Sequence, residues 1–252
     1  MSWQLHFLGV GSAEAVALGA SSAVLERDGK PLLLIDCGPD TLDRYLASYI
    51  TPPPALFITH THMDHVAGME RLFSKLWFDQ RWRGRTKVFV AAGLMPWLQT
   101  RVADYPGALA EGGVNFWEAF QLLPCTRGFW LDGLWFDVFP TRHHVPGTSF
   151  GLALAGSFVY TGDTRPIPEV LSAYEGGSEW IAHDCGLIAN PSHTGVDDLS
   201  REYSPTLRSR LLLYHYGSAA DGVTLTAHGY RVAVAGERID LREPNTAPGN
   251  AG

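Results

Sequence analysis

The heptapeptide Thr-His-Thr-His-Met-Asp-His at positions 59–65 constrains the fold and function of this chain more than any other feature. It follows Ala55–Thr59, a short apolar run typical of a buried strand. Three imidazoles and a carboxylate crowded after such a strand are polar groups that all need partners. A divalent metal ion supplies those partners, and imidazole with carboxylate suits zinc, iron or manganese. The motif therefore predicts a metal site at the end of a strand.

The spacing inside this motif predicts two ions rather than one. His60 and His62 are two residues apart and can converge on a single ion. Asp64 and His65 are adjacent, so their side chains diverge from the first pair and can reach a second ion. A histidine-rich surface loop is the alternative interpretation. It is common for one His-x-His pair and rare for this whole heptapeptide after a strand.

The composition is that of a compact protein without a visible membrane or export signal. The chain has 252 residues, of which 46% are hydrophobic and 18% charged. No apolar run approaches the roughly 20 residues that span a bilayer, and the N-terminus shows no signal-peptide pattern. Cys37, Cys125 and Cys185 form no Cys-x-x-Cys pair, which predicts reduced thiols in a cytoplasmic protein. The formal charge of −7 argues against a broad surface for nucleic acid, although bound metal ions would make the site itself positive.

Strand-like and helix-like runs recur in the same order in two halves of the chain. Strands are expected at 5–8, 22–25, 32–35, 56–59, 134–139, 150–154, 158–161 and 211–214, and helices at 41–50, 66–77, 168–174 and 196–210. Strands come first in each half and helices follow. This order predicts two sheets packed face to face with helices outside, an α/β protein with a four-layer αββα sandwich. Residues 1–241 are expected to form a single domain, and residues 242–252 a flexible C-terminal tail.

The His-x-His-x-Asp-His pattern at a strand end resembles the signature of the metallo-β-lactamase superfamily, and the resemblance covers nearly the whole chain. Four more motifs carry it: the strand and glycine turn at 7–13, Asp-Cys-Gly at 36–38, Tyr-Thr-Gly-Asp-Thr at 160–164 and Leu-Tyr-His at 213–215. The resemblance implies the metallo-β-lactamase fold and a metal-dependent hydrolase. It also implies that Asp36 braces the metal loop, that Asp163 bridges both metals and that His215 is the last ligand.

The third ligand of the first ion is expected in the run Arg-His-His-Val-Pro-Gly at 142–147. His144 is favoured, because His-Val-Pro-Gly resembles the family's His-x-Pro-Gly. His143 would then support the site from behind, or face the other way along a strand. Sequence reasoning leaves the two histidines in competition, with His144 as the expected ligand.

A further histidine points to one branch of the superfamily. Asn-Pro-Ser-His-Thr at 190–194 resembles the extra histidine motif of the tRNase Z and phosphodiesterase branch, in which a histidine protonates the leaving oxygen. His193 lies 22 residues before His215 and is the expected general acid. The alternative is a helix-entry residue, with Ser192 or Thr194 as the cap.

Two relatives within this branch compete. The run at 162–166 resembles tRNase Z, but short bacterial forms of that family insert a tRNA-binding arm between the third histidine and the bridging aspartate, where only 18 residues separate His144 from Asp163. The run at 62–68, the Asp-Cys pair at 184–185 and the spacing of His193 resemble the small cyclic-phosphate phosphodiesterase of phosphonate breakdown. The cysteine-rich zinc insertion of that enzyme is missing from residues 13–23. The missing arm and the acidic charge favour a small substrate over tRNA.

These observations predict a dinuclear metal-dependent hydrolase, a phosphodiesterase acting on a small cyclic or nucleotide-like phosphodiester. Two ions about 3.5–4 Å apart would lower the pKa of a bridging water towards 7. Zn²⁺ is the first expectation for both ions, with Mn²⁺ or Fe²⁺ as alternatives, and Asp64 and His193 are the expected catalytic residues. The expected ligands are His60, His62, Asp64, His65, His144, Asp163 and His215.

The expected partner is a small phosphodiester. RNA is less favoured, no membrane partner is expected, and a homodimer is left open. Three other functions compete: a tRNase Z-type RNA-processing endonuclease, a hydrolase of thioesters, lactones or lactams, and a metal-bound binding protein without turnover. Some residues keep a second interpretation. Trp77, Trp82 and Arg165 either line the pocket or have structural contacts, His6 and His183 are expected to be core or supporting groups, and His228 is expected in a C-terminal hairpin.

Overall fold

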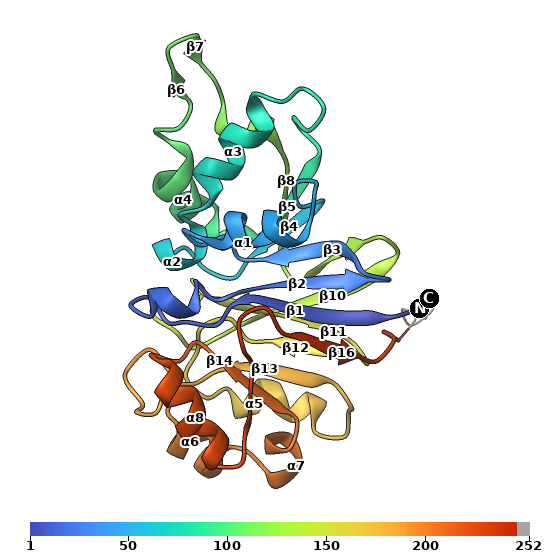
Figure 1. Ribbon diagram of the computed structural model, residues 1–252, viewed down its shortest axis with the longest axis vertical. Coiled ribbons are helices and arrows are strands. Elements are labelled where there is room, and N and C mark those ends of the chain that lie inside the picture. Colours follow the sequence, from blue (N-terminus) through green and yellow to red (C-terminus); the bar gives the residue numbers. More distant parts are fainter. Residues whose placement is uncertain (246–252) are drawn as a thin grey trace.

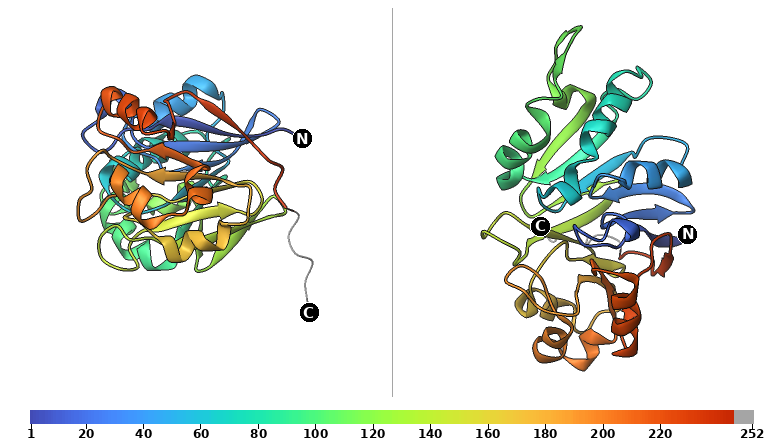
Figure 2. Two further views of the ribbon diagram at one scale, coloured as in Figure 1. Left: turned by 90° about the horizontal axis from the view of Figure 1, so that it is seen from below. Right: turned by 60° about the vertical axis from the view of Figure 1, so that its left-hand side comes forward.

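Two seven-stranded sheets form the centre of the protein (Figure 1), in a computed structural model that describes residues 1–245. The first sheet has the order β16 (Arg238–Leu241), β1 (Trp3–Gly9), β2 (Ser22–Arg27), β3 (Lys30–Ile35), β4 (Ala55–Ile58), β5 (Thr86–Ala91) and β8 (Phe120–Cys125). The second has the order β15 (Arg231–Val232), β14 (Leu211–Tyr214), β13 (Trp180–Asp184), β12 (Phe158–Tyr160), β11 (Phe150–Leu154), β10 (Leu134–Pro140) and β9 (Gly128–Leu131). A hairpin of β6 (Ala108–Leu109) and β7 (Gly112–Gly113) projects from the layered body (Figure 2).

Helices cover the outer side of each sheet. The first sheet carries α1 (Thr41–Ser48), α2 (Met63–Val66), α3 (Met69–Trp77) and α4 (Met95–Leu98), which lie above it in Figure 1. The second carries α5 (Pro168–Leu171), α6 (Val196–Glu202), α7 (Pro205–Arg208) and α8 (Ala219–Ala227), which lie below. The predicted αββα sandwich is therefore confirmed.

The alternation of side chains along the strands explains the layers. In β4, Phe57 packs in the core between the two sheets, whereas Leu56 and Ile58 pack in a second core with residues of α1 and α3. Because successive side chains of a strand point to opposite faces, one apolar run supplies both cores.

The parallel strands determine where the loops of the site meet. β3, β4, β5 and β8 are parallel neighbours, and so are β12, β13, β14 and β15. Loops at the carboxyl ends of parallel strands are the usual ligand-binding positions of such sheets. Isolated bridges from His60 to Ser149 and from Gly11 to Tyr216 join loops of the two sheets at this edge.

Three predicted elements differ from the structure. The helix expected over 196–210 is two helices, because α6 ends at Glu202 and Pro205 begins α7 after the Ser204 cap. The helix expected over 66–77 is likewise divided between α2 and α3. The hairpin expected around His228 is wrong, since α8 ends there and His228 is exposed.

The beginning of the predicted tail is held against the body of the protein. Pro244 is buried, and the N–H of Asn245 donates to the carbonyl of Ala155 (2.9 Å). Residues 246–252, the rest of the predicted tail, lie outside the described residues. All three cysteines are buried and free, as expected. None of the helices within residues 1–245 combines the length and the apolarity that crossing a bilayer requires.

Candidate metal centre

Three histidines and an aspartate from three loops face one point. His60 and His62 follow β4, His143 follows β10 and Asp163 follows β12. Nδ1 of His62 lies 3.1 Å from Nε2 of His60 and 3.0 Å from Nε2 of His143. Oδ2 of Asp163 lies 3.6 Å from Nε2 of His60 and 3.8 Å from Nε2 of His143. Ligand atoms about 2.1 Å from a tetrahedral ion are about 3.4 Å apart, so this first cluster matches one ion.

A second cluster shares Asp163 with the first. Oδ2 of Asp163 also lies 3.3 Å from Nε2 of His65 and 3.2 Å from Nε2 of His215. Oδ2 of Asp64 completes the group, 3.4 Å from the His65 nitrogen and 3.8 Å from the His215 nitrogen. Because Asp163 belongs to both clusters, its carboxylate is positioned to bridge two ions.

Unpaired polar atoms show that the residues fit bound cations. Nε2 of His65, Nε2 of His215 and Oδ1 of Asp163 are buried and have no hydrogen-bond partner among the described residues. A buried polar atom left unpaired costs about 1–3 kcal/mol, and here three such atoms lie in one place. A donor set of imidazoles and carboxylates suits Zn²⁺, Mn²⁺ and Fe²⁺. The two clusters therefore fit divalent metal ions.

Asp36 holds the metal loop from behind, as the resemblance implied. It follows β3 with a left-handed backbone (φ 60°). Its Oδ1 accepts the N–H of Thr59 (2.8 Å), and its Oδ2 accepts the Thr59 hydroxyl and the Nδ1–H of His65, both at 2.7 Å. With Nδ1 donating, Nε2 of His65 is the atom left for an ion. The loop also packs tightly on Gly38, where an added Cβ would lie 2.0 Å from the carbonyl oxygen of Asp64.

The choice of His144 as third ligand of the first cluster does not match the structure. His143 is buried, and its Nδ1–H donates to the carbonyl of Ser192 (3.0 Å), which leaves Nε2 for the cluster. His144 is exposed, with Nδ1 3.1 Å from the Ser192 hydroxyl. The alternation expected for a strand does not hold, because β10 ends at Pro140 and both histidines lie in the following loop, with ring centroids 4.1 Å apart. The first cluster therefore contains His143 in place of the expected His144.

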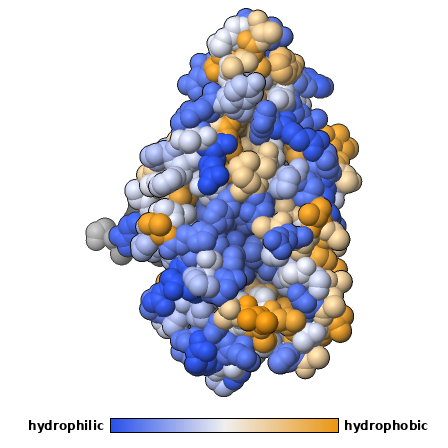
Figure 3. Space-filling view, turned by 90° about the vertical axis from the view of Figure 1, so that its left-hand side faces the viewer, coloured by the Kyte–Doolittle hydropathy of each residue, from blue (hydrophilic) through white to orange (hydrophobic). Residues whose placement is uncertain are grey.

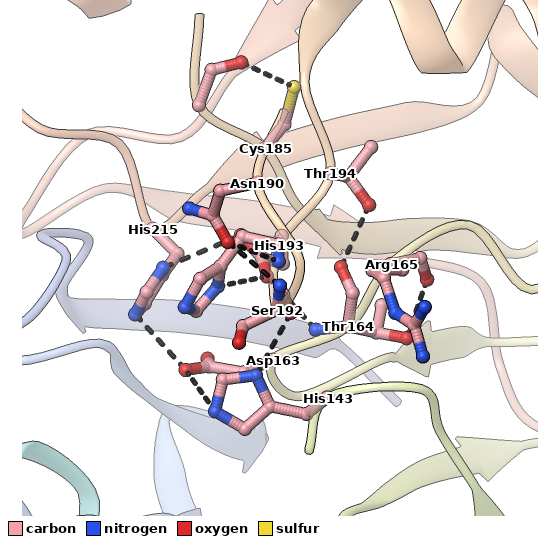
Figure 4. A network of polar contacts seen from close by, with 12 residues as sticks. His143, Asp163, Thr164, Arg165, Cys185, Asn190, Ser192, His193, Thr194 and His215 are labelled. Atoms are coloured by element: carbon pink, nitrogen blue, oxygen red, sulfur yellow. Dashed lines mark hydrogen bonds and ion pairs between the residues drawn. The ribbon is translucent and has the colours of Figure 1, made fainter. Parts of the chain in front are cut away.

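His193 lies beside the second cluster (Figure 4). Its ring stacks on that of His215, with centroids 4.9 Å apart, and its Nδ1–H donates to Oδ2 of Asp184 (2.8 Å). The same carboxylate oxygen accepts the N–H of Thr164 (2.9 Å), and the other lies 3.4 Å from Nδ1 of His215. Asp184 therefore orients His193 and His215 together. Sequence reasoning noted Asp184 only as part of a family resemblance.

The residues around His193 do not cap helix α6. α6 begins after Gly195, whose N–H donates to the side chain of Asp198 (3.0 Å). The side chain of Asn190 instead accepts the N–H groups of Ser192 (2.8 Å) and His193 (3.0 Å), so the loop has its own turn. The alternative in which Ser192 or Thr194 caps the helix is therefore wrong.

Burial and neighbouring carboxylates divide the histidines into two groups. Burial lowers the pKa of His60 well below its ordinary value and that of His143 to about 4, so both rings are neutral at pH 7. Burial also acts to lower the pKa of His65 and His215, but Asp163 and other carboxylates outweigh it. They raise the pKa of His65 well above its ordinary value and that of His215 to about 10. The second cluster therefore attracts positive charge, and a metal ion would displace these protons.

A cavity of about 660 Å³ opens over the clusters. Asp64, Asp163, His193 and His215 form part of its lining, and Figure 3 shows a hydrophilic hollow on this face. The cavity has the size of a small-molecule site. Trp77, Trp82 and Arg165, for which the sequence allowed a place in the pocket, are not among the residues that line this cavity. Trp77 and Trp82 pack against the core on the outer side of the first sheet, and Arg165 donates to the carbonyl of Arg142.

Comparisons with known proteins agree with this fold. The structure is similar to YhfI from Bacillus subtilis, a metallo-β-lactamase fold protein, with a TM-score of 0.75 and 14% identity over 95% of this chain and 100% of that one. It is also similar to a diphosphatase of the PhnP family, with a TM-score of 0.76 and 17% identity over 96% and 99% of the two chains.

The αββα fold and the two histidine–aspartate clusters define a metal-dependent hydrolase of the metallo-β-lactamase superfamily. In sequence, the model of the anti-Pycsar protein Apyc1 family matches residues 3–237, and the chain belongs to this family. The anti-Pycsar protein Apyc1 of Paenibacillus harenae is 29% identical over 227 residues, which cover 86% of this chain and 91% of that protein.

Proposed function

We propose that this protein is a dinuclear metal phosphodiesterase that hydrolyses cyclic nucleotides, with His193 as the general acid. Membership of the Apyc1 family supports a metal-dependent phosphodiesterase-type function. The observation that carries the mechanism is the position of His193, which lines the cavity, stacks on His215 and is held by Asp184.

Each cluster has a separate part in this proposal. His60, His62 and His143 hold the first ion, and Asp64, His65 and His215 hold the second. Asp163 contacts both. Zn²⁺ is the expected metal, with Mn²⁺ or Fe²⁺ as alternatives. When bound, two such ions supply hydroxide near neutral pH and polarise the phosphoryl group.

His193 provides the proton for the leaving oxygen. A ribose alkoxide is a poor leaving group, so its departure needs a proton donor. Because Nδ1 of His193 donates to Asp184, only Nε2 can carry a proton towards the substrate. The Asp184 carboxylate also stabilises the charged ring: burial lowers the pKa of His193, but the hydrogen bond and charge of Asp184 raise it above its ordinary value. The proton passes from Nε2 to the departing oxygen.

The size of the site favours a small substrate over tRNA. Between the histidine doublet and Asp163 the chain forms only the hairpin of β11 and β12, as the short spacing predicted. The cavity of about 660 Å³ suits a single nucleotide. The acidic net charge of −7 also disfavours a polyanion.

The test compares wild type with His193→Ala on leaving groups of different quality. His193→Ala should keep both metals and lower the turnover of a 3′,5′-cyclic mononucleotide by roughly 10²–10⁴-fold, the usual contribution of a positioned acid. Turnover of bis(p-nitrophenyl) phosphate, whose phenolate leaves readily, should fall far less. His228→Ala removes an exposed histidine at the end of α8 and serves as the control.

Other outcomes would change the conclusion. If the protein hydrolyses thioesters or lactones but no phosphodiester, the proposed phosphodiesterase is replaced by an acyl hydrolase. An equal loss on both phosphodiesters in His193→Ala, with metals intact, would make His193 a substrate-positioning residue. Silence of the metal-loaded protein on every substrate would favour a binding protein.

A further inference from the structure

The wall of the cavity carries two carboxylates that the proposed chemistry does not use. Glu14 lies in the loop after β1, and Asp221 lies in the first turn of α8. No hydrogen bond or ion pair joins the Glu14 side chain to another described residue. Oδ1 of Asp221 accepts the hydroxyl of Ser218 (2.9 Å), whereas its Oδ2 has no partner within the described part of the chain. Both carboxylates are therefore available to a bound molecule.

The backbone holds these two residues in place. The N–H of Ser12 donates to the carbonyl of Tyr216 (3.2 Å), which ties the loop of Glu14 to the loop that leads into α8. The N–H of Ala15 donates back to the carbonyl of Ser12 (2.9 Å). The Ser218 hydroxyl accepts the N–H of Asp221 and caps the helix. A negative charge in the first turn of a helix interacts favourably with the helix dipole. The wall therefore presents fixed negative charge.

Apart from the histidines and the proposed ions of the metal centre, the lining contains no cationic side chain that would offset this charge. No lysine or arginine is among the residues that line the cavity, all of which the structure describes. Sites for multiply charged phosphates normally use such side chains. Leu187 and Ile188 instead add an apolar surface, and Ile188 is 84% exposed although it lines the cavity. This wall matches an uncharged, partly apolar group with hydrogen-bond donors.

We propose that Glu14 and Asp221 are specificity residues that restrict the site to phosphodiesters with a single negative charge. Resting on the proposed function, this inference adds which cyclic nucleotides are accepted. The carboxylates accept hydrogen bonds from the hydroxyl and amino groups at the uncharged end of the substrate, and they repel a second anionic group. At a separation of about 6 Å and an intermediate effective dielectric, each carboxylate lowers the affinity for such a group on the order of tenfold.

A pair of substrates that differ by one charge tests the proposal. The 2′-O-butyryl and 2′-O-succinyl esters of one 3′,5′-cyclic mononucleotide have the same length, but the second ends in a carboxylate. Wild type should prefer the butyryl ester in kcat/KM by roughly tenfold or more. Glu14→Gln and Asp221→Asn should each reduce this preference several-fold, and the double variant should remove most of it. Glu175→Gln changes the charge equally at an exposed position after α5 and should leave the preference unchanged.

Salt and a charge reversal give independent readouts. Because the interaction is between charges near solvent, the wild-type preference should shrink as the salt concentration rises from about 0.05 to 0.5 M. Glu14→Lys should favour the succinyl ester. If Asp221→Asn loosens α8 and lowers the melting temperature, the two Glu14 variants in the exposed loop still decide the question.

The possible failures are distinguishable. If the double variant hydrolyses the butyryl ester and prefers it over the succinyl ester as strongly as wild type does, this inference is wrong and the proposed function stands. Equal wild-type hydrolysis of both esters has the same meaning. If neither ester nor the parent cyclic nucleotide is hydrolysed by metal-loaded protein, the proposed function fails, and this inference fails with it.

Discussion

The fully buried carboxylate of Asp184 contacts two histidines of the site. Its Oδ2 accepts two hydrogen bonds, from Nδ1 of His193 and from the N–H of Thr164, and its Oδ1 faces Nδ1 of His215. Asp184→Asn keeps the shape and removes one accepting oxygen. If the amide oxygen stays towards His193, the new NH₂ group faces His215. Nδ1 of His215 must then accept, its proton moves to Nε2, and Nε2 can no longer bind an ion. If the amide is reversed, its NH₂ group faces Nδ1–H of His193 and the N–H of Thr164, so neither donor has an acceptor.

The magnitude follows from the bonds that are lost. Either orientation removes a favourable contact between a carboxylate oxygen and a histidine, the 3.4 Å ion pair with His215 or the hydrogen bond from His193. Such a contact to a charged group contributes about 1.5–3 kcal/mol, or roughly 10- to 100-fold in an equilibrium or a rate. Asp184→Asn should therefore weaken metal binding at the second cluster, or lower kcat/KM for a cyclic nucleotide, by this factor. Metal content after dialysis against a graded chelator measures the first effect. Parallel kinetics on the cyclic nucleotide and bis(p-nitrophenyl) phosphate measure the second, and the cyclic nucleotide should lose more.

Asp198→Asn provides a matched control. Asp198 is also a buried acceptor, but it caps α6 through the N–H of Gly195 rather than supporting a histidine. Its replacement should cost about 1 kcal/mol of stability and leave metal content and leaving-group preference unchanged. Asp184→Asn with full metal occupancy and both activities within threefold of wild type would refute the role assigned to Asp184.

Three further predictions concern the metal centre. His143→Ala should lower metal occupancy at the first cluster while His144→Ala leaves it near normal, and elemental analysis showing the reverse would return the ligand position to His144. Chelation should lower the melting temperature in calorimetry, because each ion at a thousandfold excess over its Kd contributes about 4 kcal/mol of stability. Adding the metal back should restore the melting temperature. A melting temperature that chelation does not change would contradict the fit of the unpaired atoms to metal ions. Gly38→Ala should displace the loop of Asp64, since the new Cβ would lie 2.0 Å from the carbonyl oxygen of that residue, and should reduce metal content and activity at least tenfold. Gly176→Ala is its control, because a Cβ added there would meet no atom within 4 Å and neither glycine has a left-handed backbone. Normal metal content in Gly38→Ala would show that the loop tolerates the shift.

Much of the metal centre could be predicted because the motifs are local. His60, His62, Asp64 and His65 lie within six residues, so the spacing alone indicated that they act together. The positions of the αββα layers followed from periodicity, since a strand covered on both faces must be apolar at successive residues. Strand β5 and strand β8 were nevertheless not anticipated, although they complete the first sheet.

The histidine doublet shows where sequence reasoning ended. His143 and His144 have the same chemistry and adjacent positions, and the strand rule used to separate them does not apply in a loop. The hydrogen bond from His143 to the carbonyl of Ser192 decides which ring is held against the cluster, and that carbonyl is 49 residues further along the chain. No local pattern contains this information.

The sequence by itself identified most of the side chains that form the two clusters and the order of the layers, because ligand spacing and apolar periodicity are properties of short segments. Only the tertiary structure decided how those segments converge. Asp184 joins His193 to His215, and Glu14 from the loop after β1 shares a cavity wall with Asp221 from α8. These relations depend on parallel strands of two different sheets ending at one edge, where loops distant in sequence are brought within hydrogen-bond distance.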